Sequence, residues 1–214
     1  MMHKIIVVGI GPGDASYILP KALNIIQNAR ILVGGRRALS DFSSGHAKEC
    51  TVGADIPAVL NFIRSSLKED DVVVMVSGDP GYYSLLDALR RTFSAEQIEV
   101  VPGLSSFQLA FARLALPWHH ARLLSFHGRL PSSEELDYNP SSVLGMLSDG
   151  HNDSRLIAQC LLTHGWHVYD KMYICTHLSY EDEEIVEKTL GTAAQEPGVG
   201  HGVLIVCAAE ENRV

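Results

Sequence analysis

The sequence predicts an α/β protein built on a largely parallel sheet, and three observations point to this fold class. Short apolar, β-branched runs such as Ile5–Val8 and Val72–Val76 are typical of strands buried on both faces. Stretches with helical spacing, such as Ile56–Leu67, separate these runs. Glycine- or proline-rich turns follow several of them. Such alternation favours a parallel sheet with helices on both faces.

The segment 1–117 carries this alternation most clearly, and we interpret it as an N-terminal α/β domain. Strands are expected at Ile5–Val8, Ile31–Val33, Val72–Val76 and Ile98–Val101. Helices are expected at Ser16–Ala29, Ile56–Leu67, Tyr82–Phe93 and Ser105–Leu116, where apolar residues repeat at helical spacing.

Pro117-Trp118-His119-His120 interrupts the pattern, so we place a domain boundary between residues 117 and 118. The segment 118–214 is expected to form a C-terminal mixed α/β domain, with an active-site crevice between the two domains. Its predicted strands are Arg122–Phe126, Ser142–Leu147, Lys171–Cys175 and Gly202–Cys207. Its predicted helices are Asp153–His164 and Glu183–Leu190, and Pro131–Pro140 is expected to be a loop.

Composition narrows the class of protein. Of the 214 residues, 46% are hydrophobic and 20% charged, which is ordinary for a globular chain. The net charge of −8 argues against a nucleic-acid or anionic-membrane binder, since those partners favour a basic surface. The four cysteines form no CxxC pair, and the apolar run Ile5–Val8 is too short for a signal peptide or a membrane span. We therefore expect reduced thiols and a cytoplasmic protein.

The first glycine-rich turn, Gly9–Asp14, narrows the choice of ligand without settling it. A dinucleotide fingerprint needs glycines at its first, third and sixth positions, and the sixth here is Asp14. No Gly-Lys-Ser/Thr triplet occurs, which excludes a nucleotide P-loop. A simple tight turn and an NAD(P)-dependent oxidoreductase stay open as alternatives for this turn alone.

Two further turns favour a shared ligand site. Ser77–Gly81 and Val101–Ser106 also follow predicted strands, at the carboxyl ends where open α/β sheets bind their ligands. Ser105 or Ser106 also suits a helix N-cap. Together the three turns predict a crevice of backbone amides and small side chains, suited to a neutral-to-cationic ligand the size of adenosine.

The sequence resembles the tetrapyrrole methylase family over nearly its whole length. The motifs GIGPGD, SGDPGYYS and VPGLSS are similar to the three S-adenosylmethionine loops of that family. GGRRAL, FHGR and HLSYEDE, which start at Gly34, Phe126 and His177, resemble the carbon-5 precorrin methyltransferase branch (CbiE, also the N-terminal half of CobL). The resemblance implies a two-domain fold and methyl transfer to a precorrin or cobalt-precorrin, at carbon 5 of precorrin-7, in cobalamin biosynthesis. Methylation of another precorrin carbon, or ligand binding without catalysis, are the alternatives.

The resemblance also implies which residues bind the methyl donor, S-adenosyl-L-methionine. They are Pro12, Ser77, Gly78, Asp79, Tyr82, Ser105 and Ser106, with Leu147 and Leu178 from the second domain. Asp79 suits two roles equally, a hydrogen bond to the donor or an Asx cap on the turn at Pro80. Tyr82 and Tyr83 are expected to open a helix.

Substrate contacts are expected from arginines, because a precorrin carries many carboxylates that guanidinium groups bind in pairs. Arg36, Arg37 and Arg129 stand beside glycines in expected loops. His127 is the candidate to move the proton lost from the methylated carbon, with a structural histidine as the alternative. The histidines show no ligand spacing, so we predict no protein-bound metal, and any cobalt would arrive with the substrate.

Two departures from the family pattern limit the comparison. Glu181 stands where branch members usually carry proline, and Gly34-Gly35 stands where uroporphyrinogen methylases usually carry an acidic residue. No catalytic carboxylate is therefore carried over. The resemblance further implies a homodimer and a separate decarboxylating carbon-15 methyltransferase as a partner.

Overall fold

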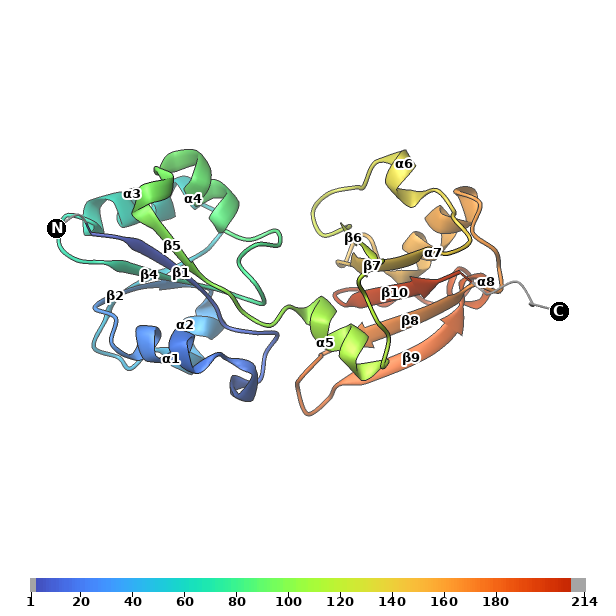
Figure 1. Cartoon of the computed structure of the whole chain (residues 1–214), viewed down its shortest axis with the longest axis horizontal. Helices are drawn as coiled ribbons and strands as arrows, with labels where there is room; N and C mark the ends of the chain where they lie inside the picture. Colours follow the sequence, from blue (N-terminus) through green and yellow to red (C-terminus); the bar gives the residue numbers. More distant parts are fainter. Residues whose placement is uncertain (1–2, 209–214) are drawn as a thin grey trace. The chain divides into compact units, whose positions relative to one another are not determined.

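The computed structural model describes residues 3–208, and the chain divides into two compact units (Figure 1). The first unit ends at Ser106 and the second begins at Phe107. The helix α5 (Ser106–Arg113) thus belongs almost entirely to the second unit, whereas the sequence placed the boundary beyond it, after residue 117. No helix within residues 3–208 is both long and apolar enough to cross a bilayer.

The first unit contains a five-stranded parallel sheet. Its strands are β1 (Ile5–Gly9), β2 (Ile31–Gly34), β3 (Lys48–Thr51), β4 (Val72–Val76) and β5 (Ile98–Val101). The order is β3-β2-β4-β1-β5, which places β1 between β4 and β5. All four strands predicted in this unit are present, and β3 was missed because its residues are polar and mostly exposed at the sheet edge.

Helices cover both faces of this sheet, as predicted. They are α1 (Pro20–Gln27), α2 (Arg36–Phe42), α3 (Ile56–Ser66) and α4 (Leu86–Thr92). Figure 1 shows α1 and α2 on one side and α3 and α4 on the other. Ile26 and Leu39 pack in one cluster with Val8, while Ile63 and Leu89 pack in a second cluster with strand residues of the opposite face. Alternate β1 residues thus face opposite layers, which explains why the strand is apolar throughout.

The second unit contains a mixed five-stranded sheet. Its strands are β6 (Arg122–Ser125), β7 (Val143–Leu147), β8 (Lys171–Thr176), β9 (Glu184–Thr189) and β10 (Val203–Cys207), in the order β6-β7-β10-β8-β9. Only β6 and β7 pair in parallel. The mixed architecture predicted for the C-terminal part is confirmed.

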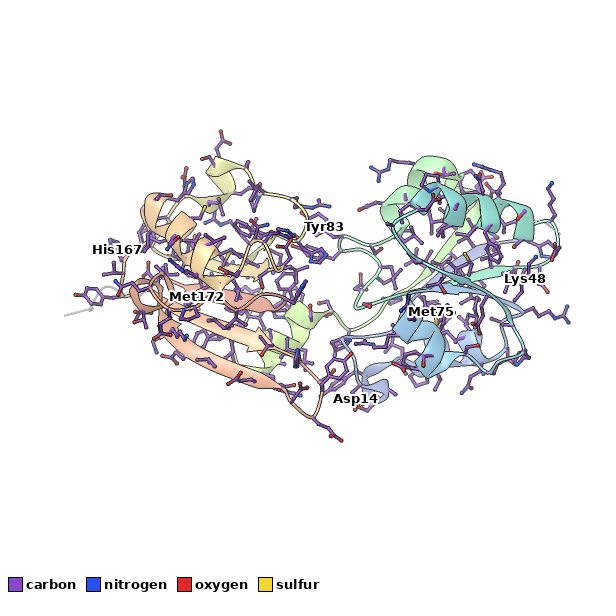
Figure 2. All side chains as sticks on the ribbon, turned by 180° about the vertical axis from the view of Figure 1, so that it is seen from behind. Asp14, Lys48, Met75, Tyr83, His167 and Met172 are labelled. Carbon is purple, nitrogen blue, oxygen red and sulfur yellow. The ribbon has the colours of Figure 1, made fainter. Side chains whose placement is uncertain are left out.

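Helices α5, α6 (Ser133–Leu136), α7 (Ser154–Thr163) and α8 (Leu190–Ala193) complete the second unit. Ile157 and Leu161 of α7 pack in one buried cluster with Met172 of β8, the last of which is labelled in Figure 2. Phe107 of α5 lies against Gly145 of β7, where an added Cβ would stand 3.1 Å from the ring. The neighbours of Gly145 along the strand point into the α7 cluster, so α5 covers the opposite face.

The helix predicted at Glu183–Leu190 is wrong, because most of this segment forms strand β9. All six β9 residues pair antiparallel with β8, and Ile185, Val186 and Thr189 are β-branched residues that suit a strand. A short apolar pattern does not distinguish a helix from a strand. This segment becomes a strand because it pairs with the edge of β8 that β10 leaves open. The loop predicted at Pro131–Pro140 contains the one-turn helix α6, for which Ser132 and Glu135 form a capping box.

Candidate active site

Three glycine-rich loops meet at the carboxyl edge of the first sheet. They follow β4, β1 and β5, which are neighbours and parallel, so their carboxyl ends share one edge. The Gly78 N–H donates to the Gly11 carbonyl at 2.8 Å, which joins the first and second loops. The Gly103 N–H donates to Oδ2 of Asp79 at 3.1 Å, which joins the second and third. The structure thus brings the three predicted loops together.

The loops approach so closely that no side chain fits between them. A Cβ added at Gly9 would lie 2.5 Å from the Gly78 carbonyl oxygen, and one added at Gly103 would lie 2.3 Å from that same atom. Gly78 itself has φ of +67°, a conformation that residues with a side chain rarely adopt. These glycines therefore set the spacing of the three loops.

The sheet topology places a ligand crevice at these loops. The connection from β1 passes through α1 on one face of the sheet, and the connection from β4 passes through α4 on the other. β1 and β4 are neighbours, and the connections that follow them leave toward opposite faces of the sheet. A gap therefore opens outside the carboxyl ends of these two strands. In open α/β sheets this switch point is where ligands bind.

A cavity of about 370 Å³ lies at this edge. Its lining combines apolar side chains, one hydroxyl and two guanidinium groups: Ile10, Pro12, Gly35, Arg36, Arg37, Ala38, Met75 and Ser77. The size falls within the range of small-molecule sites, roughly 300–1,000 Å³. Two residues expected to bind the methyl donor, Pro12 and Ser77, therefore share one cavity with two expected to bind the substrate, Arg36 and Arg37.

Two local expectations at this edge are wrong. Arg36 and Arg37 do not lie in a loop but occupy the first positions of α2, both exposed. Tyr82 and Tyr83 do not open a helix, because α4 begins only at Leu86. The Ser84 hydroxyl donates to the Pro80 carbonyl at 2.6 Å and accepts the Leu86 N–H, so a separate turn holds the tyrosines before the helix starts. Tyr83 accordingly has a positive φ of 48° and lies exposed (Figure 2).

The carboxylate of Asp79 links two loops. Its Oδ1 accepts the Gly81 N–H at 2.7 Å, which is the Asx cap considered from the sequence, and its Oδ2 accepts the Gly103 N–H. Both carboxylate oxygens of Asp79 therefore accept hydrogen bonds from backbone N–H groups. Ser105 stands close to Gly78, and Ser106 begins α5, as its suitability for a helix start suggested.

The second unit also gathers its predicted site residues at one edge. Strand β10 runs antiparallel to both β7 and β8, so β6, β7 and β8 all run in one direction and end at the same edge. His127 and Arg129 lie in the turn after β6, Leu147 ends β7, and Leu178 lies in the loop after β8. His127 and Arg129 are exposed, whereas Leu178 is buried.

The sequence profile of the family Tetrapyrrole (Corrin/Porphyrin) Methylases matches residues 4–194. The chain belongs to the tetrapyrrole methylase family. It is 34% identical over 179 residues to the cobalt-precorrin-7 C(5)-methyltransferase of Salmonella typhimurium, covering 84% of this chain and 87% of that one. It is 29% identical over 195 residues to the probable cobalt-precorrin-7 C(5)-methyltransferase of Methanocaldococcus jannaschii, covering 87% and 89%. The predicted family and its carbon-5 branch are confirmed.

A solved structure shares the fold of this tetrapyrrole methylase. The uroporphyrin-III C-methyltransferase of Thermus thermophilus, complexed with S-adenosyl homocysteine, superposes with a TM-score of 0.76 at 20% identity. The match covers 95% of this chain and 92% of that one. The predicted two-part α/β fold class is confirmed.

Sequence reasoning missed the residues that hold the second-unit loops of this methylase in place. The loop after β8 contains two non-glycine residues with positive φ, His177 at 45° and Ser179 at 75°. Glu183 holds it, accepting the Ser179 N–H and the guanidinium of Arg113 on α5, the latter from Nε at 2.6 Å. The Arg113 hydrogen bond holds the pKa of Glu183 below its usual range. The only sequence signal was the HLSYEDE motif, which did not reveal the partner of Glu183.

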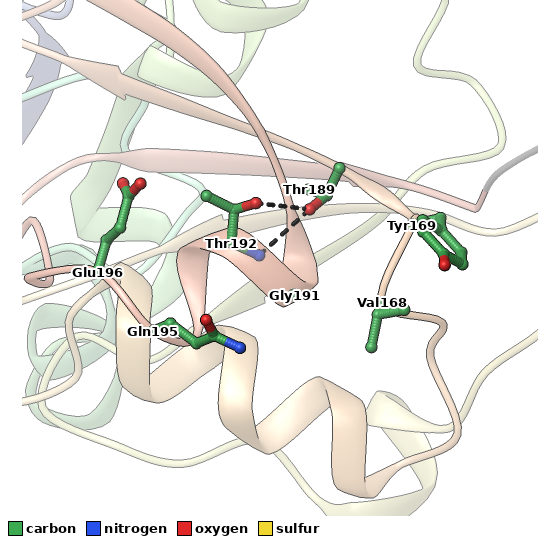
Figure 3. A pocket seen from close by; sticks show the side chains of 7 residues that line it. All are labelled: Val168, Tyr169, Thr189, Gly191, Thr192, Gln195 and Glu196. Carbon is green, nitrogen blue, oxygen red and sulfur yellow. Dashed lines mark hydrogen bonds between the residues drawn. The ribbon is translucent and has the colours of Figure 1, made fainter.

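A second hollow lies at the opposite edge of this sheet (Figure 3). It measures about 290 Å³ and is lined by Val168, Tyr169, Thr189, Gly191, Thr192, Gln195 and Glu196. Thr189 accepts the Thr192 N–H at 3.2 Å and so caps α8. None of the predicted site residues lines this hollow. Within residues 3–208, no group of three or more histidine, cysteine or acidic side chains is arranged to hold a metal ion.

Proposed function

We propose that this chain transfers the methyl group of S-adenosylmethionine to a ring carbon of a precorrin or cobalt-precorrin, carbon 5 of precorrin-7, in cobalamin biosynthesis. The cavity at the switch point carries the proposal, because it collects Pro12 and Ser77 from the donor loops and Arg36 and Arg37 from α2. Donor and acceptor must meet in one place for a methyl transfer. The choice of carbon 5 of precorrin-7 as the methylated position rests on the names of the relatives, which are cobalt-precorrin-7 C(5)-methyltransferases.

The residues present fit S-adenosylmethionine, which supplies an electrophilic methyl group on a sulfonium. The three loops offer backbone groups and hydroxyls, and Ile10 and Met75 add an apolar wall to the cavity. On this proposal the donor-binding residues are Pro12, Ser77, Gly78, Asp79, Tyr82, Ser105 and Ser106, together with Leu147 and Leu178.

Arginines provide the substrate contacts in this proposal. A protein of net charge −8 repels a polycarboxylate at long range, so local positive charge has to overcome that repulsion. Arg36 and Arg37 line the cavity, and Arg129 is exposed on the turn after β6. Guanidinium groups bind carboxylates in bidentate pairs, which would fix the orientation of the ring as well as its affinity.

The chemistry asks the protein mainly for positioning. The acceptor carbon is already nucleophilic through conjugation with a pyrrole nitrogen, so no strong base has to create it. Holding carbon, methyl and sulfur in line contributes roughly 7–11 kcal/mol to lowering the barrier. As the carbon–carbon bond forms, the carbon–sulfur bond breaks and its electron pair stays on sulfur. His127, exposed at the edge of the second sheet, is the proposed acceptor of the proton lost afterwards.

Labelled S-adenosylmethionine and a panel of precorrin intermediates test the proposal. We expect label on one precorrin, with the new methyl on carbon 5. Arg36→Ala and Arg129→Ala should raise the dissociation constant of the tetrapyrrole and leave that of the donor unchanged. Arg90→Ala, an exposed arginine on α4, is the matched control. Tight donor binding without methyl transfer to any corrinoid would refute the proposal. A new methyl on another carbon would refute carbon 5 and identify the chain as a precorrin methylase that acts at a different position.

We extend the proposal to the setting of the enzyme on the strength of the family resemblance alone. It would be a cytoplasmic homodimer without a resident metal, working beside a separate decarboxylating carbon-15 methyltransferase. Light scattering of the purified protein tests the dimer, and a monomer at micromolar concentration would contradict it.

A further inference from the structure

A buried carboxylate and its neighbours fix the turn after β6 that carries His127 and Arg129. The Gly128 N–H donates to Oδ2 of Asp149 at 2.8 Å. Two residues earlier, the Phe126 carbonyl accepts the side-chain N–H of Asn152 at 2.9 Å. The backbone of His127 is therefore held on both sides, and its own N–H donates to the Ser125 hydroxyl at 3.2 Å.

Asp149 holds the turn after β6 in its ionised, carboxylate form. Its side chain is only 7% exposed, and its Oδ1 accepts the N–H groups of His151 at 2.8 Å and Asn152 at 2.7 Å. The hydrogen bond from Gly128, then those from Asn152 and His151, hold the pKa of this carboxyl far below its usual range, with a smaller contribution from the charge of His127. Charge-assisted hydrogen bonds of this kind are short and geometrically strict, so the turn has little freedom.

A second histidine reaches the same place from a distant part of the chain. The rings of His127 and His201 lie 6.2 Å apart between centroids. His201 precedes β10 and has a positive φ of 45°. Ser148 holds the neighbouring residue Gly202, accepting its N–H through Oγ at 2.9 Å and donating its own N–H to the Gly202 carbonyl at 3.0 Å. Such backbone strain is kept only where surrounding contacts impose it.

We propose that His127, Arg129 and His201 form one carboxylate-binding cluster for the tetrapyrrole, and that Asp149 is the positioning residue that builds it. All three cluster side chains are exposed at the edge where β6, β7 and β8 end, and Asp149 is buried beside their turn. Each cluster residue can donate hydrogen bonds to a carboxylate, the group in which a precorrin is rich. This inference rests on the proposed function and adds His201 and Asp149 to it.

A purely structural Asx turn is the competing explanation, and Asp170 provides the matched control. Asp170 is also a buried aspartate of the second unit, fully shielded from solvent, and accepts the His167 N–H at 2.7 Å. It precedes β8 and so lies at the opposite edge of the sheet, near His167 (Figure 2). Asp170→Asn removes the same charge from a comparable backbone cap without touching the cluster.

The experiment compares Asp149→Asn, His201→Ala and Asp170→Asn with the wild-type protein. The measurements are melting temperature, the affinity for S-adenosylmethionine, the affinity for uroporphyrin III as a stable polycarboxylate probe, and KM and kcat with the precorrin. Asp149→Asn and His201→Ala should raise the probe dissociation constant and the precorrin KM about tenfold or more, since the first displaces and the second removes hydrogen-bond donors to a charged carboxylate. Donor affinity should stay within about twofold. Asp170→Asn should lower the melting temperature and leave both ligand affinities unchanged.

Two results would overturn the inference. One is an unchanged probe affinity in His201→Ala, which alters only an exposed side chain and should fold normally. The other is Asp149→Asn and Asp170→Asn behaving alike in probe affinity. Failure of the proposed function looks different, because the wild-type protein would then bind uroporphyrin III through the cluster yet transfer no methyl group to any precorrin.

Discussion

Replacing Gly103 with alanine tests whether the contact between the three loops builds the donor site. The new Cβ would lie 2.3 Å from the Gly78 carbonyl oxygen and 2.8 Å from the Gly9 Cα, whereas real Cβ contacts essentially never fall below 3.0 Å. All of these atoms are backbone, so no side-chain rotation relieves the clash and a loop must move. Overpacking costs about 1–3 kcal/mol, and a clash with backbone belongs at the upper end, so we expect the melting temperature to fall by about 6–12 °C.

Gly53→Ala is the matched control, because nothing lies within 4 Å of a Cβ added there and its backbone is unstrained. Differential scanning calorimetry gives the stability of both variants, and isothermal titration with S-adenosylmethionine gives the donor affinity. We expect Gly103→Ala to lose at least about tenfold in donor affinity, equivalent to about 1.4 kcal/mol, because the loop displaced by the clash carries residues of the proposed donor site. Donor affinity and melting temperature equal to those of Gly53→Ala would refute the argument that close loop packing shapes the site.

Substitutions at three further positions test the stability of the two units. Phe107→Ala should cost about 3–5 kcal/mol in urea unfolding, since this ring is almost fully buried between α5 and β7, and a loss below 1 kcal/mol would contradict that packing. Asp55→Ala removes the side-chain cap on the Ala58 N–H at the start of α3 and should cost about 1 kcal/mol, whereas Asp55→Ser should restore most of it. Glu183→Gln should cost about 1 kcal/mol, because its ion pair with Arg113 is partly exposed. The lowered pKa of Glu183 makes this difference complete above its ordinary value of 4.5 and lost as the pH falls through the folded-state value, so a difference that does not shrink as the pH is lowered below 4.5 would argue against the ion pair.

Strands buried on both faces were predictable, whereas two of the edge strands, β3 and β9, were not. β4 consists of five buried apolar residues, which leaves little choice of interpretation. The edge strand β3 has no such run, because only one neighbour, β2, constrains it. β9 was misassigned for a related reason, since its identity depends on pairing with β8 rather than on its own pattern. Local sequence determines an element most firmly where burial on both sides leaves one solution.

The three glycine-rich loops were visible in the sequence because glycines follow predicted strands. The hydrogen bonds that hold such loops in place were not visible, since each joins residues far apart in the chain. Asp79 reaches Gly103, and Asp149 reaches Gly128, through hydrogen bonds that only the sheet order makes possible. Asp149 stands before Gly150, a dipeptide typical of an ordinary turn. His201 had no signal at all, because its proximity to His127 depends on β10 lying beside β7.

The position of the crevice in the first unit follows from strand order and handedness together. Parallel connections are right-handed in nearly all proteins, so the direction in which a chain moves along the sheet decides the face that its helix covers. From β1 the chain passes beyond β4 to reach β2, and from β4 it passes beyond β1 to reach β5, in the opposite direction. α1 and α4 must therefore lie on opposite faces, as they do. The gap between β1 and β4 is thus a consequence of the strand order, and the glycines at 9, 78 and 103 are the residues that let three loops enter it.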